Sequence, residues 1–165
     1  MCTLPEQLDT AFKDVGWVPT DSINLITTWK IAYSSLFDQP YPTAPGTPSF
    51  WDSRPNDFSY EKPTASVRER QHIHIWATPY AVDGKALWLA TAHFDKDVKL
   101  GKDFIPTHII DPLVDNERDS LKSQLLKTKD IASVKEVKVV DPVLGQNQAG
   151  SVFYTDGKGY VIKLK

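Results

Sequence analysis

Three histidines and an aspartate stand at alternating positions in two neighbouring segments that are typical of β-strands. His72 and His74 lie in the first segment, and His93 and Asp95 lie in the second, with the turn signal Asp83-Gly84 between them. Asp-Gly pairs favour two-residue hairpin turns, and successive side chains of a strand point to opposite faces. The sequence therefore predicts a β-hairpin that carries all four polar side chains on one face.

A two-residue turn at Asp83-Gly84 also predicts which residues oppose one another across the hairpin. The predicted opposed pairs are His74 with His93, His72 with Asp95, and Trp76 with Thr91. The side chains that should point to the other face are those of Ile73, Ile75 and Phe94. We therefore expect a polar site on one side of this hairpin and an apolar surface on the other.

A divalent transition metal is one ligand that such a site could hold. Opposed strand residues have side-chain origins about 5 Å apart, which is close enough for two imidazoles to share one ion. Zinc suits two or three histidines with a carboxylate, so the candidate ligands are His72, His74, His93 and Asp95, with His108 as a further one. The alternative is that these histidines are structural groups that face solvent or form hydrogen bonds.

A second hypothesis is a noncatalytic module that binds an anion such as a phosphate or a lipid headgroup. Arginines and histidines supply the donors, and a tryptophan could support an apolar tail. The candidate ligand-binding residues are Arg68, Arg70, His72, His74, Trp76, His108, Asp111, Asp115 and Arg118. Asp111 weakens this hypothesis, because as a helix N-cap its carboxylate would occupy the position of an anion.

A third hypothesis is a hydrolase of the phosphatase or esterase kind, with His108 or His74 as base and Asp111 or Asp95 orienting it. The sequence carries no nucleophile elbow, phosphate loop or zinc-protease motif. Its one cysteine, Cys2, lies at a terminus and is a poor nucleophile candidate. We therefore favour binding over catalysis, and a structural or protein-interaction domain stays open as a further alternative.

Length and composition indicate a soluble globular chain. It has 165 residues, of which 41% are hydrophobic and 24% charged, and a net charge of −2, which gives no electrostatic reason to bind nucleic acid. No apolar run is long enough to span a bilayer. The single cysteine excludes an intramolecular disulfide, and its place beside Met1 is compatible with a trimmed lipoprotein signal or a plain surface thiol.

The remaining elements follow from spacing and turn residues. A first helix is predicted from Leu4, Leu8, Ala11, Phe12 and Val15, with Thr3 as N-cap, Pro5 in the first turn and Gly16 at the end. A second helix, capped by Asp21, has the apolar stripe Ile23, Ile26, Trp29, Tyr33 and Leu36/Phe37. Prolines and aromatic residues at 40–63 predict a long ordered connection; a polyproline ligand at 42–45 is the alternative.

The C-terminal half is predicted to contain one helix and more strands. A strand at 106–110 leads into a helix with Asp111 as N-cap and Pro112 at its first position, which runs to Lys127 or Lys129. Residues 134–140 form a strand, and 152–155 and 160–164 form a second hairpin around the turn at 156–159. The prediction is one α+β domain, residues 1–165, with a mostly antiparallel sheet of about five or six strands, two N-terminal helices and one later helix packed on it.

Arg118 is an anomaly on the later helix. Helical spacing places it on the inward stripe with Val114, Leu121 and Leu125, where a charge must find partners. Asp115 and Asp111 lie near the same helix face. Two interpretations stay open: a structural ion pair that holds the start of the helix, or a guanidinium that points into an anion-binding pocket.

Several segments spread over most of the chain resemble the LssY C-terminal domain family. They are Pro40–Pro45, Arg54–Pro63, Arg70–Trp76, Trp88–Ala92, His108–Pro112, Asp115–Asp119, Asn147–Gly150 and Phe153–Gly157. Members of this family occur alone or fused to membrane proteins, including phosphatidic-acid-phosphatase-like ones. The resemblance implies a bacterial, membrane- or envelope-associated setting, with a lipid headgroup or a membrane protein as partner, and it supplies no established reaction or ligand.

One residue departs from the family pattern. The family tends to place an arginine where this chain has His74, so a metal site built on His74 would be particular to this protein. The residues that match the pattern are Arg70, His72, His108, Asp111 and Arg118. The resemblance therefore implies that these five are the safer candidates for a site shared across the family.

Overall fold

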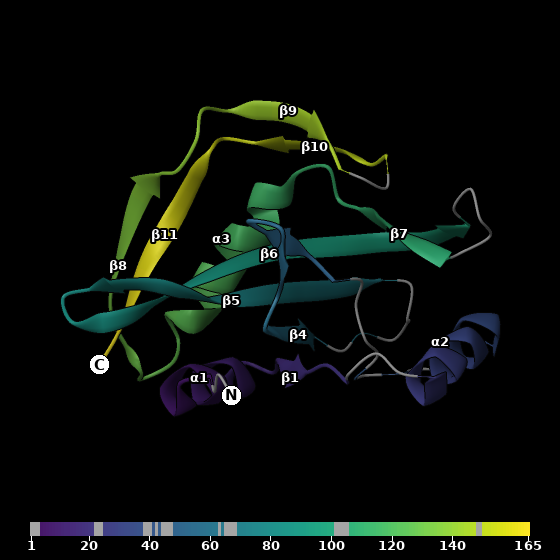
Figure 1. Ribbon diagram of the computed structural model, residues 1–165, viewed down its shortest axis with the longest axis horizontal. Coiled ribbons are helices and arrows are strands. Elements are labelled where there is room, and N and C mark those ends of the chain that lie inside the picture. Colours follow the sequence, from purple (N-terminus) through teal and green to yellow (C-terminus); the bar gives the residue numbers. More distant parts are fainter. Residues whose placement is uncertain are drawn as a thin grey trace.

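A five-stranded antiparallel sheet forms the centre of the domain (Figure 1). The computed structural model describes residues 4–21, 25–37, 41, 43, 48–62, 64, 69–100, 106–147 and 150–165. The strand order is β1-β4-β5-β6-β7, with bounds Val18–Pro19, Phe58–Lys62, Arg70–Val82, Lys85–Leu100 and Pro106–Ile110. A single α+β domain with mostly antiparallel pairing is confirmed, and the strand predicted at 106–110 is β7.

The hairpin of β5 and β6 contains the predicted turn and one unpredicted irregularity. Asp83 and Gly84 both have positive φ, 52° and 75°, as a two-residue hairpin turn requires. Farther from the turn, three residues of β5, Thr78 to Tyr80, stand opposite the single residue Leu87 of β6. Pro79 lacks the N–H that a regular ladder needs, and Thr78 Oγ1 instead donates to Leu87 O at 2.6 Å.

This bulge changes the predicted pairs but not the predicted faces. The opposed pairs are His72 with His93, Arg70 with Asp95, and His74 with Thr91, so the predicted register was wrong by two residues. A shift of two residues returns every side chain to the same face, because side chains alternate with a period of two. The expected shared face of the histidines and Asp95 is therefore confirmed.

The apolar face of the sheet is covered by two helices, α1 (Glu6–Asp14) and α3 (Val114–Leu125). Their buried residues pack on β4 and β5 in one core, which contains Ala11, Phe12, Trp17, Tyr60, Ile73, Ile75, Leu121 and Leu125. The first helix ends before Gly16, whose φ of 85° is unfavourable for other residues. Its predicted cap, Thr3, lies outside the described residues.

Helix α2 (Leu25–Phe37) exposes the apolar stripe that the sequence predicted. Ile26, Trp29, Tyr33 and Phe37 are each more than half exposed. Asp21, the predicted cap, accepts hydrogen bonds from the hydroxyls of Tyr41 and Thr43 at 2.8 and 2.9 Å, and residues 22–24, which it would cap, lie outside the described residues. Across the described ranges, no helix is long and apolar enough to cross a membrane.

The start of α3 differs from the prediction. The helix begins at Val114 with Leu113 as its N-cap, so Asp111 and Pro112 precede it. Asp111 Oδ1 accepts a hydrogen bond from the N–H of Leu113 at 2.8 Å, which forms a turn before the helix. The helix also ends at Leu125, earlier than predicted.

The inward stripe of α3 was predicted correctly at Leu121 and Leu125 and wrongly at Arg118, whose place Glu117 takes. Its buried residues are Glu117, Leu121 and Leu125, at steady spacings of four. Arg118 lies at the side of this stripe, with 18% of its side chain exposed. Because Glu117, Leu121 and Leu125 face the sheet, Arg118 lies beside this stripe and contacts the C-terminal strands.

The C-terminal strands form a bent two-stranded arm beside α3 (Figure 1). β8 (Ile131–Lys138) pairs with β11 (Lys158–Leu164), and β9 (Val143–Gln146) pairs with β10 (Val152–Thr155). The predicted hairpin between 152–155 and 160–164 was therefore wrong: these two strands follow each other along the arm, and residues 156–157 form the bend. Within the predicted connection 40–63, the described part contains β2 (Phe50–Trp51), β3 (Arg54–Pro55) and β4.

Gly157 is the residue that permits this bend. Its φ is 76°, and a Cβ there would lie 2.2 Å from Val140 O. We expect Gly157→Ala to lower the free energy of unfolding by about 2 kcal/mol or more, because backbone strain and a steric clash add together. Urea denaturation of both proteins measures this difference.

Gly84→Ala is the matched control. Gly84 has a similar φ of 75°, and a Cβ there would have no atom within 4 Å. The free energy of unfolding of this variant should therefore fall by only about 1 kcal/mol, which is the cost of the left-handed backbone conformation. Equal losses in the two variants would contradict the close approach at Val140.

Candidate functional site on the polar face of the sheet

Three imidazoles and a carboxylate, here named the histidine cluster, lie together on the face of the sheet opposite to α1 and α3. The cluster consists of His72, His74, His93 and Asp95. The ring centroid of His93 lies 5.4 Å from that of His72 and 5.3 Å from that of His74. His72 Nε2 is 2.9 Å from Asp95 Oδ2, and His93 Nε2 is 3.5 Å from Asp95 Oδ1.

A buried ion pair flanks the cluster. Arg70 stands opposite Asp95 in the β5–β6 ladder, and Glu61 of β4 stands opposite His72 on the other side of β5. Arg70 Nη1 donates to Glu61 Oε2 at 3.1 Å, and the two side chains are 4% and 0% exposed. Burying so many polar groups is costly unless they are paired, so their concentration on one face makes this face the candidate site.

Two further residues extend this face along the sheet. Ser59 Oγ lies 3.3 Å from His74 Nδ1 and accepts a hydrogen bond from Asn56 Nδ2 at 2.7 Å. Trp76 is buried, and its indole N–H donates to Arg54 O at 3.2 Å. The polar face therefore runs across β4, β5 and β6, with Trp76 at one end.

All three histidines of the cluster are neutral at physiological pH. Burial, with a smaller effect of the Arg70 charge, lowers the pKa of His72 to about 3, and burial, with a smaller effect of the neighbouring His72 ring, lowers that of His74 to about 4. Burial also lowers the pKa of His93 to about 4, although Asp95 acts in the opposite direction. Each ring therefore offers one N–H donor and one nitrogen acceptor.

The imidazoles lie nearly parallel, which bears on metal binding. The ring planes of His74 and His93 differ by 12°, and those of His72 and His74 by 11°. Nitrogen lone pairs lie in the plane of the ring, so near-parallel rings do not direct them at one point. Among the described residues, no three side chains of the His, Cys, Asp and Glu types are arranged to hold a metal ion.

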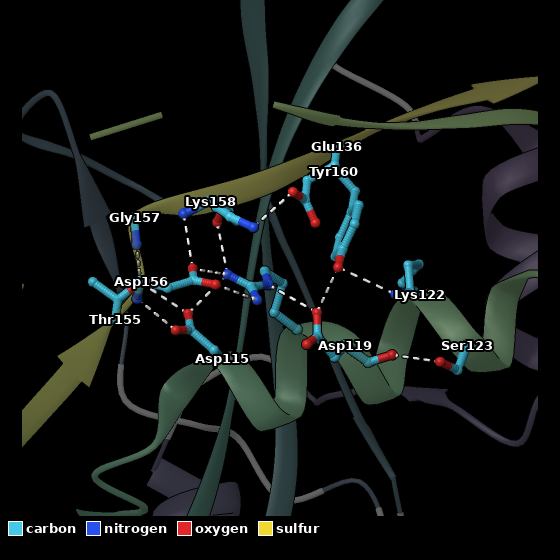
Figure 2. A network of polar contacts seen from close by, with 11 residues as sticks. Asp115, Asp119, Lys122, Ser123, Glu136, Thr155, Asp156, Gly157, Lys158 and Tyr160 are labelled. Atoms are coloured by element: carbon cyan, nitrogen blue, oxygen red, sulfur yellow. Dashed lines mark hydrogen bonds and ion pairs between the residues drawn. The ribbon is translucent and has the colours of Figure 1, made fainter. Parts of the chain in front are cut away.

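Arg118 belongs to a different network, between α3 and the bend of the arm. Figure 2 shows the partners in this network that are labelled there, among them Asp115, Asp119 and Asp156. The Arg118 guanidinium donates to Asp115, Asp119 and Asp156 at 2.9, 3.1 and 2.6 Å and to Lys158 O at 2.9 Å. Burial lowers the pKa of Arg118, but the hydrogen bonds to Asp156 and Asp119 outweigh this and raise it above its usual range. In return, the Arg118 hydrogen bond lowers the pKa of Asp156 to about 2.

Asp115 also binds the arm directly, as Figure 2 shows. Its Oδ2 accepts from the N–H of Asp156 at 2.6 Å, and its Oδ1 accepts from Thr155 Oγ1 at 2.8 Å. Asp111, by contrast, pairs with Lys96 at 2.8 Å and does not contact Arg118. The aspartates of α3 therefore hold the arm against the helix.

The sequence-predicted residues thus fall into separate places. The structure brings together Arg70, His72, His74, Trp76, His93 and Asp95, and it sets Asp111, Asp115 and Arg118 apart from them. Arg68 lies outside the described residues, and of His108 the structure describes the backbone in β7 and not the side chain. Sequence reasoning missed Glu61 and Ser59, although the alternation of apolar and polar residues in 58–62 marks that segment as a half-buried strand.

The low pKa values predict a loss of stability in mild acid. The unfolded chain takes up protons on its histidines near pH 6.5, whereas folded His74 and His93 stay neutral down to about pH 4. The free energy of unfolding should therefore fall between about pH 6.5 and pH 4, by about 1.4 kcal/mol per pH unit for each such histidine. His74→Gln should reduce this slope in urea titrations, and an unchanged slope would contradict the neutral cluster.

The Arg118 network predicts a second effect on stability. Arg118→Met leaves three carboxylates close together without their shared cation, so the free energy of unfolding should fall by more than the ~1 kcal/mol of a typical exposed ion pair. Lys138→Met is the control, because Lys138 is 69% exposed and pairs with Asp141 alone in the described part of the chain. Similar losses in the two variants would show that Arg118 does not hold the arm.

Comparisons with known proteins place the chain in one family. A family model described as LssY C-terminus matches residues 1–158 of the 165. Comparison with curated proteins gives no match, and comparison with solved structures gives none either. Because the family match covers nearly the whole chain, and agrees with the resemblance carried by the sequence motifs, this protein belongs to the LssY C-terminal domain family.

Proposed function

We propose that this domain is a binding module for a phosphate-like oxyanion, and that the ligand contacts the polar face of the sheet at Arg70 and the histidine cluster. One observation carries the proposal. The guanidinium of Arg70 is 96% buried, and within the described residues Glu61 is its one hydrogen-bond acceptor, while Nε has none. A buried guanidinium has five N–H donors and needs acceptors for them, which a bound oxyanion supplies.

The neighbouring side chains can complete such a site. Neutral His74 and His93 each have an N–H to donate, and the hydroxyl of Ser59 lies beside His74. The near-parallel rings suit several separate hydrogen bonds to a multidentate ligand better than convergence on one metal ion. This is the reason for preferring an oxyanion to zinc at the same residues.

Catalysis is less well supported by the same arrangement. Nucleophilic hydrolysis needs one histidine that contacts both a hydroxyl and an orienting carboxylate. Here Ser59 lies beside His74, whereas Asp95 lies beside His72 and His93. The parts of a relay are thus divided between different rings, which favours binding over turnover.

The carboxylates of Glu61 and Asp95 repel an anion, so the pH dependence of anion affinity has a predictable sign. With neutral histidines, one arginine and two carboxylates give the face a formal charge of −1. A bound anion stabilises imidazolium, so it raises the histidine pKa values and binds together with protons. Affinity should therefore increase as the pH falls, whereas a metal ion, which needs neutral imidazoles, shows the opposite trend.

Calorimetric titration tests the site. Sulfate is the probe for the pH series because its charge is constant, and inorganic phosphate is the second probe. We expect saturable sulfate binding that tightens from about pH 7.5 to about pH 6. Binding should weaken about tenfold or more in Arg70→Gln, and Arg70→Lys should retain part of it. Lys138→Gln, which removes an exposed charge on β8, should bind as the wild type does.

Titration with zinc chloride tests the competing hypothesis of a metal site. Saturable zinc binding that weakens with falling pH and is lost in His74→Gln, without any sulfate binding, would replace the oxyanion proposal with a metal site. The pH series uses the wild-type protein, so it remains decisive if a variant fails to fold.

A separate experiment identifies the source of the oxyanion, because a lipid headgroup and a free phosphate share this chemistry. We propose a membrane- or envelope-associated setting, which the family resemblance supports. Vesicles of phosphatidylcholine with phosphatidic acid are compared with pure phosphatidylcholine vesicles in co-sedimentation. Selective, Arg70-dependent sedimentation identifies a lipid source, and binding of soluble phosphate alone identifies a free one.

A further inference from the structure

A pocket lies on the side of the sheet opposite to the histidine cluster, where the first turns of α3 cross β5 and β6. Its volume is about 300 Å³, and its lining includes Gln71 and Phe94 from the sheet and Leu113, Asn116 and Ser120 from the region of α3. Gln71 and Phe94 oppose each other in the β5–β6 ladder and alternate with the residues of the polar face. The pocket is therefore separate from the histidine cluster.

A buried carboxyl group, that of Glu117, also lines this pocket. Glu117 is 6% exposed, and its Oε2 accepts a hydrogen bond from Gln71 Nε2 at 3.0 Å. Its other oxygen, Oε1, is buried and has no hydrogen-bond partner in the described parts of the chain. A buried acceptor left in this state is costly, which indicates that a donor from outside the chain completes it.

The charges around the pocket restrict the kind of donor. Among the described residues, its lining contains two acids, Asp111 and Glu117, and no Lys, Arg or His. Asp111 already pairs with Lys96 and accepts a hydrogen bond from the N–H of Leu113, in the turn that precedes α3. An anion would face both acids, whereas a cation would be attracted by Glu117.

The walls of the pocket add an apolar requirement. The ring of Phe94 and the side chain of Leu113 offer apolar surface, and an aromatic ring also attracts a cation over its face. The amide of Gln71 and the side chains of Asn116 and Ser120 supply further acceptors. We infer that this pocket binds an alkylammonium group, with Glu117 as the ion-pair partner and Phe94 and Leu113 against the alkyl chain.

The burial of Glu117 is consistent with a ligand that brings a positive charge. Burial raises the pKa of Glu117 above its usual value, although the hydrogen bond from Gln71 and the charge of Lys62 act in the opposite direction. An ammonium ion within hydrogen-bond distance would favour the ionised carboxylate. Binding of the amine should therefore release protons wherever the empty pocket holds protonated Glu117.

Titration of the ¹⁵N-labelled chain with butylammonium chloride tests the inference. We expect saturable chemical-shift changes at the backbone amides of Phe94, Glu117 and Ser120. The neutral analogue, 1-butanol, should bind at least about tenfold more weakly than butylammonium. Shifts of equal affinity with 1-butanol would overturn the ion pair. An absence of saturable shifts at these amides would overturn the site, and neither result bears on sulfate binding at Arg70.

Variants locate the charge. Glu117→Gln keeps the size of the side chain and should weaken butylammonium binding by about tenfold or more. Glu136→Gln is the matched control, because Glu136 is on β8 and pairs with Lys158 outside the pocket; it should bind as the wild type does. Unchanged affinity in Glu117→Gln would overturn the assignment, and the wild-type comparison with 1-butanol still decides if that variant does not fold.

Two sources could present an alkylammonium group, a small free amine or the lysine side chain of a protein. The N-acetyl methylamide derivative of lysine and ethanolamine are therefore titrated in parallel. Tighter binding of the lysine derivative identifies a protein partner, and tighter binding of ethanolamine identifies a small amine.

Discussion

The backbone hydrogen bonds between β5 and β6 join strands of 13 and 16 residues on both sides of one bulge, and both candidate sites lie on surfaces that this pairing creates. Alternation along these strands sends His72 and His93 to one side and Gln71 and Phe94 to the other. The bulge at Pro79 offsets the pairing by two residues, which is the smallest shift that leaves this division intact. A shift of one residue would exchange the polar and apolar faces and place imidazoles against α3.

The polar face has a large energetic cost, which the protein limits by keeping its histidines neutral. Charged imidazoles at this depth would have to lose their hydration, so burial lowers the pKa values of His72 and His74 far below the usual value. Arg70 remains a buried cation and is balanced by Glu61 at 3.1 Å. Such a pair contributes little to stability by itself.

The C-terminal arm illustrates how ion pairs can position one element against another. The bend at Gly157 brings Asp156 to α3, where Arg118 and Asp115 bind it from two sides. Ile131 and Ile162 of the arm pack against the edge of the main core. The helix is thereby held between the sheet and the arm, and its Glu117 side faces the sheet. The same packing that turns Arg118 toward the arm places Glu117 in the pocket that Gln71 and Phe94 also line.

Local patterns were enough to predict part of this structure. The turn at Asp83-Gly84, the strand at 106–110 and the separation of His72 from Ile73 depend on neighbouring residues, so the sequence predicts them correctly. The pairing of 152–155 was predicted wrongly, because a turn-like tetrapeptide is also suited to a bend within a longer arm. The start of α3 was misplaced because Asp111 can form a turn before a helix as readily as it caps one.

The sequence by itself determined that His72, His74, His93 and Asp95 share one face, since alternation with a period of two survives a two-residue bulge. Only the tertiary structure decided that Glu61 and Ser59 lie beside them, that Arg118 binds Asp156, and that Glu117 is buried. Those contacts depend on which distant strands pair and how a helix rotates on the sheet. Such choices are made by the packing of the whole chain, and the spacing of residues within one segment carries little information about them.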